Sequence, residues 1–171
     1  MERISLTDYG RFVELCAGPE KDRWLPGHFV VDNNLSNDEL TADEIERSRC
    51  EDLREGYPFK DNSVDQISCR YGWRYLWRDT EELLFQLKEV ARVLVPGGRI
   101  IIQEYCRMFN NEWEEIDVTY DTLWGHFALA VMALNLEGIQ LSVEADATTK
   151  GFSEEDCIEY VWILQKPMEV K

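Results

Sequence analysis

The sequence predicts a single α/β domain over residues 1–171, built on a mostly parallel sheet with an antiparallel last strand and helices on both faces. Three observations support this prediction. Short apolar strands alternate with helical segments, a β-branched run at 99–105 is typical of a parallel sheet buried on both faces, and two late apolar runs are joined by a polar turn. The length of 171 residues fits one domain, and a hydrophobic fraction of 44% is enough for a buried core.

The first half of the chain predicts four strands. The first, RFVEL, ends at the turn signal Cys16–Pro19. The second, HFVVD, precedes a polar loop and a helical turn at about 37–46, and the third is weak. The loop PFKDNS leads into the fourth. The expected strands are residues 11–15, 28–32, 48–53 and 64–69.

The clearest helix begins after Asp79, which can cap it while Glu82 returns the bond as in a capping box. One apolar stripe at helical spacing predicts the buried face. We expect Pro96-Gly97-Gly98 to stop the helix and turn the chain. The stripe consists of Leu83, Leu84, Leu87, Val90, Ala91 and Leu94.

The second half predicts a central strand at 99–105 and a further helix over roughly 120–136, ending near Gly138. Two late strands at 139–145 and 158–165 are expected to form a hairpin.

The chain is strongly acidic, with 34 Asp and Glu against 18 Lys and Arg and a formal net charge of −16. Phosphate backbones and anionic membranes both attract basic residues, so we expect neither nucleic acid nor a membrane as a partner. The acid lies in the flanks, because residues 58–110 carry 8 basic and 7 acidic side chains.

The five cysteines lie at positions 16, 50, 69, 106 and 157, without a CxxC motif or a Cys–His pair at metal-ligand spacing. This pattern predicts no metal site and favours reduced thiols in a cytoplasmic protein. No signal peptide is recognised, and the longest apolar stretch, 127–134, is too short to span a bilayer.

Two segments resemble known motifs. The sequence PFKDNSVDQI at 58–67, followed by EVARVLVPGGRIIIQEY at 89–105, resembles the fourth-strand and fifth-strand motifs of class I S-adenosylmethionine-dependent methyltransferases. Segments that resemble the other strands of that family are VELCAGP, FVVDNN, CEDLREGYPF, IQLSVEAD and IEYVWILQKP. The resemblance covers nearly the whole chain and implies a Rossmann-like fold and S-adenosylmethionine as cofactor.

The resemblance also implies cofactor-binding residues at the first two strand ends. Glu14 and the turn at 16–20, with Cys16 and Gly18, correspond to the site of the methionine part. Asp32 corresponds to the carboxylate that accepts both ribose hydroxyls, with Asn33 near the adenine.

Two later segments complete the implied site. Asp52 corresponds to the acid that faces the adenine amino group, and Leu53 would pack on the ring. The residues just past the fourth strand, Cys69 to Tyr71 with Arg70 among them, would line the methionine end.

The chain departs from the family pattern in two ways. Of the three glycines of the family turn, only the central Gly18 is present, and Cys16 places a side chain where bare backbone is usual. The first strand begins near residue 11 and the connection to the second strand is short, which implies a reduced N-terminal part.

The segment RYGWRYLWR at 70–78 allows two interpretations. As a helix, it would place Arg70, Arg74 and Arg78 on one face, beside a ridge of Trp73 and Trp77, and so form a platform for an anionic or aromatic acceptor or for an acidic protein partner. Alternatively, the arginines pair with acidic side chains while the aromatic rings fill the core.

No catalytic base is identified, because methyl transfer is a displacement for which positioning can supply most of the rate. Glu104, Tyr105 and His126 are candidates by position, and Phe109–Trp124 could be a lid or a loop. The sequence therefore predicts a methyltransferase acting on a small molecule or a protein. The alternative is a non-catalytic relative that works as a binding or regulatory module through a protein partner.

Overall fold

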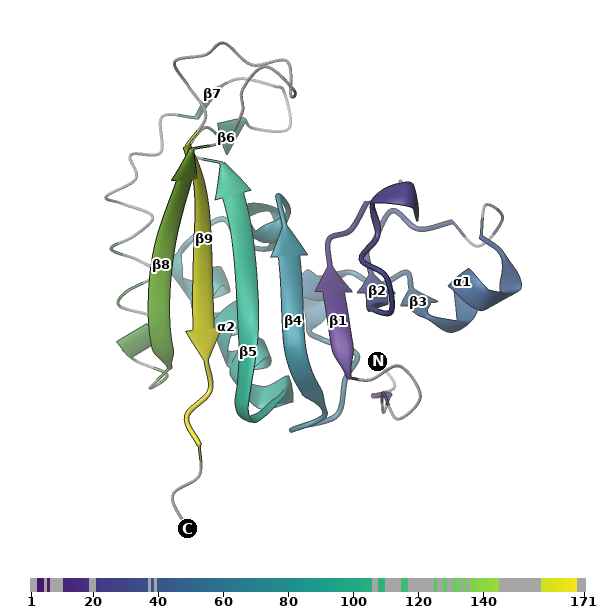
Figure 1. Ribbon diagram of the computed structural model, residues 1–171, viewed down its shortest axis with the longest axis horizontal. Helices are drawn as coiled ribbons and strands as arrows, with labels where there is room; N and C mark the ends of the chain where they lie inside the picture. The colour runs from purple at the N-terminus through teal and green to yellow at the C-terminus, as the bar shows by residue number, and fades with distance from the viewer. Residues whose placement is uncertain are drawn as a thin grey trace.

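The computed structural model describes residues 3–4, 6, 11–18, 21–36, 38, 40–105, 108–109, 115–116, 125, 128, 131–132, 134, 136–144 and 158–168. Within these ranges, seven strands form one sheet in the order β3-β2-β1-β4-β5-β9-β8 (Figure 1). They are β1 Phe12–Leu15, β2 Phe29–Val31, β3 Ser48–Arg49, β4 Val64–Arg70, β5 Leu94–Tyr105, β8 Glu137–Glu144 and β9 Ile158–Gln165. Two short strands, β6 (Met108–Phe109) and β7 (Glu115–Ile116), pair separately.

The pairing confirms a mostly parallel sheet with an antiparallel last strand. Strands β1 to β5 pair in parallel, and β9 is antiparallel to both of its neighbours, β5 and β8. The first five strands have the 3-2-1-4-5 order of a doubly wound sheet, in which the carboxyl ends of parallel strands meet at one edge. That edge lies at the top of Figure 1.

One face of the sheet carries the core. Alternate residues of the strands, such as Leu15, Ile67 and Ile102, are fully buried with the apolar side of α2 (Thr80–Val93). In Figure 1 this helix lies behind the sheet. A short helix, α1 (Ala42–Glu46), precedes the edge strand β3. The expected helix at 120–136 lies largely outside the described residues, of which Gly125, Ala128, Val131 and Met132 are helical. Gly138 lies in β8, which begins before the expected strand.

The start of α2 matches its prediction only in part. The Asp79 carboxylate accepts a hydrogen bond from Glu82 N at 2.9 Å. The Glu82 carboxylate, however, accepts from Arg78 N rather than from Asp79 N, and it also pairs with the Arg78 guanidinium. A complete capping box occurs at α1, where the side chains of Thr41 and Glu44 each accept from the other's backbone. These bonds with Thr41 lower the pKa of Glu44 to about 2.

The end of α2 differs from the prediction. The helix stops at Val93, and Pro96–Gly98 lies inside β5 rather than in a turn before it. The reason is pairing with the end of the chain, because Gly97 N donates to Lys166 O and Lys166 N donates to Gly98 O, both at 2.9 Å. The Lys166 ammonium also donates to the carbonyls of Ala91 and Leu94 at the end of the helix.

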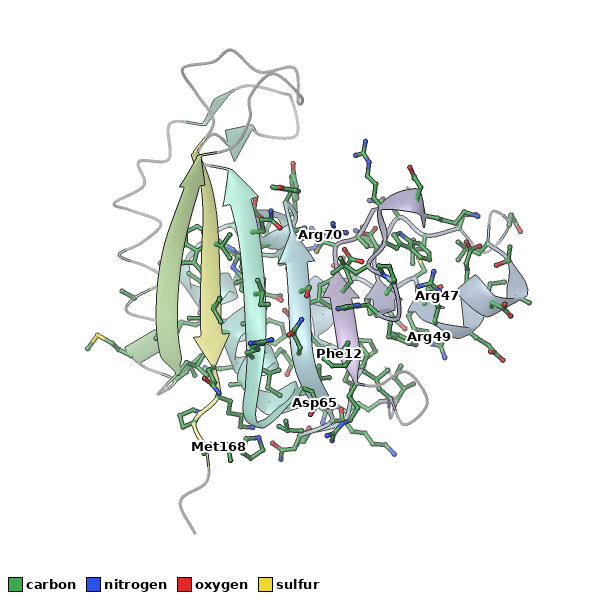
Figure 2. The ribbon with its side chains drawn as sticks, in the orientation of Figure 1. Phe12, Arg47, Arg49, Asp65, Arg70 and Met168 are labelled. Carbon is green, nitrogen blue, oxygen red and sulfur yellow. The ribbon has the colours of Figure 1, made fainter. Side chains whose placement is uncertain are left out.

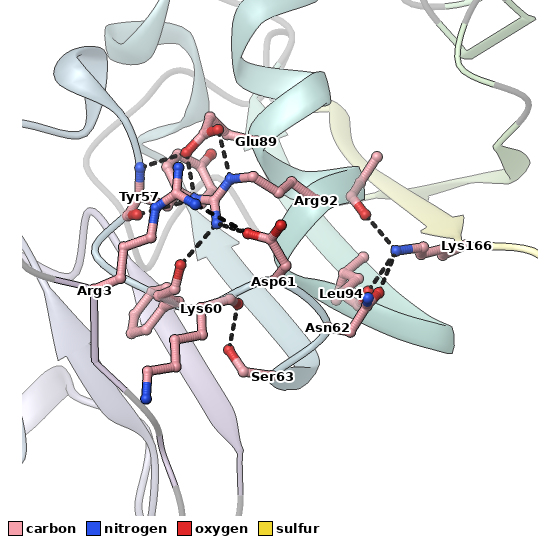
Figure 3. Close-up of polar contacts among 12 residues, drawn as sticks. Arg3, Tyr57, Lys60, Asp61, Asn62, Ser63, Glu89, Arg92, Leu94 and Lys166 are labelled. Atoms are coloured by element: carbon pink, nitrogen blue, oxygen red, sulfur yellow. Dashed lines mark hydrogen bonds and ion pairs between the residues drawn. The ribbon is translucent and has the colours of Figure 1, made fainter.

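The PFKDNS loop is fastened to α2 by one guanidinium (Figure 3). Arg92 donates to the Glu89 carboxylate at 2.6 and 2.8 Å, to Asp61 at 2.8 Å, and to the carbonyls of Tyr57 and Phe59. Glu89 in turn accepts from Tyr57 N at 2.8 Å. The family-like motif at 58–67 is therefore held by polar contacts at the end of the sheet opposite the carboxyl edge.

Candidate functional site

A cavity of about 470 Å³ lies at the carboxyl edge of the sheet, where open α/β sheets bind their ligands. Its walls come from the segments that follow β1, β2, β3 and β4. The volume falls within the range of roughly 300–1,000 Å³ that is usual for small-molecule sites. The lining residues are Cys16, Gly18, Asp32, Asn33, Asn34, Glu51, Asp52, Leu53, Arg54, Tyr71, Gly72, Tyr75 and Leu76. Six of the eight cofactor residues expected from the sequence are thus brought together.

Asp32 directly follows β2, and only 6% of its surface is exposed. Its two oxygens accept hydrogen bonds from Gly18 N at 3.0 Å and Asn34 N at 2.7 Å. A carboxylate has about four acceptor sites, so these two bonds orient Asp32 and leave acceptor capacity for a pair of ligand hydroxyls.

The turn after β1 packs tightly against the segment after β4. Cys16 has a positive φ of 55°, and the turn continues through Gly18 with φ of 72°. A Cβ at Gly72 would lie 2.2 Å from the Cβ of Cys16, so a glycine is required there. A Cβ at Gly18 would meet nothing within 4 Å, which leaves open space beside the backbone of this turn.

The wall of the cavity that follows β3 is fixed in part by Gln86, a residue that the sequence did not single out. Asp52 caps the short 3-10 helix Leu53–Glu55 by accepting from Arg54 N, and it pairs with the Arg54 guanidinium at 2.6 Å. This contact lowers the pKa of Asp52. Gln86, buried on α2, donates to Leu53 O at 3.1 Å and so fixes the position of the Leu53 backbone. The only indication of this role in the sequence is that Gln86, a polar residue, lies beside the apolar residues of α2 that face the core.

Glu14 and Arg70 do not line the cavity. Glu14 is 1% exposed and accepts from Arg70 Nε at 3.0 Å and Nη2 at 2.5 Å, while its other oxygen accepts from Leu25 N at 2.7 Å. Arg70 also donates to Arg23 O. Figure 2 shows Arg70 near the carboxyl end of β4. The pair therefore holds the short β1–β2 connection onto the sheet.

That connection has a small core of its own. Trp24 packs with Val30 and Leu35, and its ring nitrogen donates to Gly18 O at 3.0 Å. The Arg47 guanidinium lies 5.3 Å from the centre of the Trp24 ring. These contacts position the turn at Gly18 without the longer helix that a doubly wound fold usually has there.

Comparison with known proteins identifies the fold and the motifs. Residues 21–102 match the family model described as a methyltransferase domain. The chain is therefore similar to S-adenosylmethionine-dependent methyltransferases in this segment and in its fold. A solved S-adenosylmethionine-dependent methyltransferase from Methanosarcina mazei superposes with a TM-score of 0.63 at 16% identity, covering 92% of each chain. The geranyl diphosphate C-methyltransferase of Streptomyces coelicolor gives 0.54 at 17% identity, over 92% of this chain and 71% of that one.

A curated relative of this chain is the ubiquinone/menaquinone biosynthesis C-methyltransferase of Cupriavidus necator. The two are 27% identical over 105 residues, which are 61% of this chain. The match spans 40% of the length of that relative. The β1–β4 half, which contains the cavity, lies mostly within the segment that matches the family model.

The segment 70–78 does not form the continuous helix of the first interpretation. Arg70 ends β4, Tyr71 has a positive φ of 58°, and only Trp73–Leu76 form a 3-10 helix. Trp73 is buried in the core, and Arg78 pairs with Glu82. The contacts of Arg70, Arg78 and Trp73 agree with the alternative interpretation, in which arginines pair with acidic side chains and aromatic rings fill the core. Tyr71, Gly72, Tyr75 and Leu76 line the cavity.

Of the three candidate bases, Glu104 is the one whose side chain belongs to the described residues. Glu104 is buried at the end of β5 and does not line the cavity. The side chain of Tyr105, His126 and most of the 109–124 segment lie outside the described residues, as does Glu20. Among the described residues, no group of three or more His, Cys, Asp and Glu side chains could hold a metal ion. The described helices are also too short or too polar to cross a bilayer.

Proposed function

We propose that this chain binds S-adenosylmethionine in the cavity and transfers its methyl group to a small-molecule or protein acceptor. The observation that carries the proposal is the Asp32 carboxylate, oriented at the end of β2 by Gly18 N and Asn34 N and open to a ligand diol. The residues expected from the family resemblance at Cys16, Gly18, Asn33, Asp52 and Leu53 line the same cavity. We propose the whole of residues 1–171 as a single methyltransferase domain, in the cytoplasm.

The chemistry of the cavity fits the cofactor. A vicinal diol can bind the free acceptor sites of Asp32, and a purine can lie against Leu53 and Leu76. Glu51, Asp52 and Asp32 against Arg54 leave an excess of negative charge, which favours a cationic sulfonium ligand. The cofactor supplies an activated methyl group; the chain binds it, orients it and excludes water.

The acceptor is proposed to be a small molecule first and a protein side chain second, with nucleic acid disfavoured by the acidic charge. The Cupriavidus necator relative and the Streptomyces coelicolor neighbour are both C-methyltransferases by name. A nucleophilic carbon of a small molecule is therefore the acceptor class to test before others.

Calorimetry tests the cofactor. Wild-type protein is titrated with S-adenosylmethionine and with S-adenosylhomocysteine, beside Asp32→Asn and a matched control, Asp43→Asn, whose carboxylate is exposed on α1. Loss of one acceptor oxygen and the charge should weaken binding about 10- to 100-fold in Asp32→Asn, and Asp43→Asn should bind as wild type.

Two results would contradict the proposal. Absence of heat and of thermal stabilisation with either ligand at millimolar concentration would leave the non-catalytic binding module as the better interpretation. Equal binding by Asp32→Asn and wild type would show that the site is elsewhere. The acceptor class is read from transfer of labelled methyl groups into the low-mass and the protein fractions of a cell extract.

A further inference from the structure

Two cysteines lie on neighbouring strand ends beside the cavity, and one of them, Cys16, lines it. Cys16 directly follows β1, and Cys69 lies in the neighbouring strand β4, where it is the register partner of Leu15. Cys16 packs against the core cluster that contains Cys69. Adjacent positions on neighbouring strands are within the Cα separation of roughly 4.4–6.8 Å that a disulfide spans.

The surrounding backbone holds Cys16 in this place. The Cβ of Cys16 occupies the space that a side chain at position 72 would need, and its Sγ lies 3.3 Å from the same point. The positive φ of Cys16 directs the chain away from the strand while Cys16 N still donates to Val31 O at 2.9 Å. The thiol therefore cannot move far from Cys69 without displacing the Gly72 segment.

The two thiols differ in access. Cys69 is fully buried, and its burial together with Cys16 raises the pKa of the Cys69 thiol well above its usual range. Cys16 is half-buried and lines the cavity, so a small oxidant that enters the cavity reaches Cys16 first. The buried neighbour is then in position to resolve the oxidised sulfur.

We propose that Cys16 and Cys69 are an oxidative modification site, which hydrogen peroxide converts to a disulfide. In the first step the Cys16 sulfur attacks one peroxide oxygen, the O–O bond breaks, and the products are Cys16 sulfenic acid and water. In the second, the Cys69 sulfur attacks the Cys16 sulfur, the S–O bond breaks, and a second water leaves. Peroxide is reduced to water and the two thiols lose two hydrogens.

The disulfide has a consequence for the cavity, and this part rests on the proposed function. The turn at 16–18 closes one wall, with Gly18 N bonded to the Asp32 carboxylate that is proposed to receive the ribose. A ligand diol takes the remaining acceptor sites of the same carboxylate, beside this turn. Joining Cys16 to β4 prevents the turn from moving to admit the ligand, so the oxidised protein binds S-adenosylmethionine more weakly.

The test compares reduced protein with protein treated with hydrogen peroxide, for wild type and for Cys16→Ser, Cys69→Ala and Cys50→Ser. Cys50 is exposed and does not line the cavity, so Cys50→Ser is the matched control. Peptide mapping without reductant should show a Cys16–Cys69 linkage in wild type and in Cys50→Ser, reversed by dithiothreitol. Bridging the two strands should also raise the melting temperature of both oxidised proteins.

The possible results test the Cys16–Cys69 disulfide and its effect on cofactor affinity separately. Cys16→Ser and Cys69→Ala should lose the linkage and the rise in melting temperature together, and either variant alone suffices if the other does not fold. Linkages only to Cys50, Cys106 or Cys157, or none, would overturn the proposal. A mapped Cys16–Cys69 linkage with unchanged cofactor affinity would overturn the effect on the cavity. Lack of binding by the reduced protein would instead contradict the proposed function and leave the mapped linkage standing.

Discussion

Replacing Glu14 by glutamine distinguishes a structural carboxylate from a cofactor ligand. Both oxygens of Glu14 accept hydrogen bonds, one from the Arg70 guanidinium and the other from Leu25 N. In Glu14→Gln one oxygen becomes an NH₂ group, which must face one of these donors. Removing one charge of a buried pair costs about 3–5 kcal/mol, and partial exposure of Arg70 reduces this to about 2–3 kcal/mol. For a domain of this size the melting temperature should fall by about 4–12 °C.

The assay is thermal unfolding of Glu14→Gln, of Arg70→Met and of the double variant, with cofactor titration of each folded protein. If Glu14 and Arg70 stabilise the fold as a pair, the double variant should lose less stability than the two single variants lose in sum. Because Glu14 does not line the cavity, cofactor affinity should stay within about tenfold of wild type. Tenfold is about the change that the loss of one hydrogen bond to the ligand would cause. An unchanged melting temperature with abolished cofactor binding would refute the reasoning and restore Glu14 as a ligand.

Three further variants test other contacts. Gly72→Ala should lower the melting temperature by several degrees, because its Cβ would meet Cys16 at 2.2 Å, and Cys16→Gly in the same chain should restore most of it. Arg92→Met should destabilise by about 3 kcal/mol in urea unfolding, because it leaves two partly buried carbonyls without this donor and Glu89 with only the bond from Tyr57 N. Burial raises the pKa of Glu89, but bonds from Arg92 and Tyr57 outweigh it and the net pKa is lowered. The stability that this lowered pKa reflects is present above the unfolded pKa and is lost as the pH falls through the folded pKa. The difference in unfolding free energy between wild type and Arg92→Met should therefore narrow as the pH falls below the ordinary value of 4.5, and a constant difference would contradict this. Asp79→Ala should cost about 1 kcal/mol of stability through loss of the α2 cap, and no change would show that Glu82 alone suffices.

The sequence predicted the elements whose signals are local. Strand β4, α2 with its Asp79 cap and the late strand β9 were expected within a few residues, because periodicity and capping act over one or two turns. The positions of Asp32 and Gly18 were implied by the family resemblance, and both residues line the cavity at the carboxyl edge of the parallel sheet.

What the sequence missed depends on contacts between distant residues. The partner of Glu14 is 56 positions away, so the sequence alone could not show that this strand-end acid pairs with Arg70. Pro96–Gly98 was read as a stop because its pairing residue, Lys166, comes from the end of the chain. At 70–78 the regular spacing of arginines suggested a helix, but the positive φ at Tyr71 breaks it.

The position of β9 has a consequence for synthesis. Because β9 lies between β5 and β8, the strand made earlier, β8, has no place in the sheet until residues 158–165 have left the ribosome. Until then the long strand β5 presents an open edge of unpaired backbone groups, and α2 lacks the Lys166 ammonium at its end. A nascent chain can therefore assemble β1 to β5 first, but it stays exposed to edge-to-edge association until its final strand is inserted.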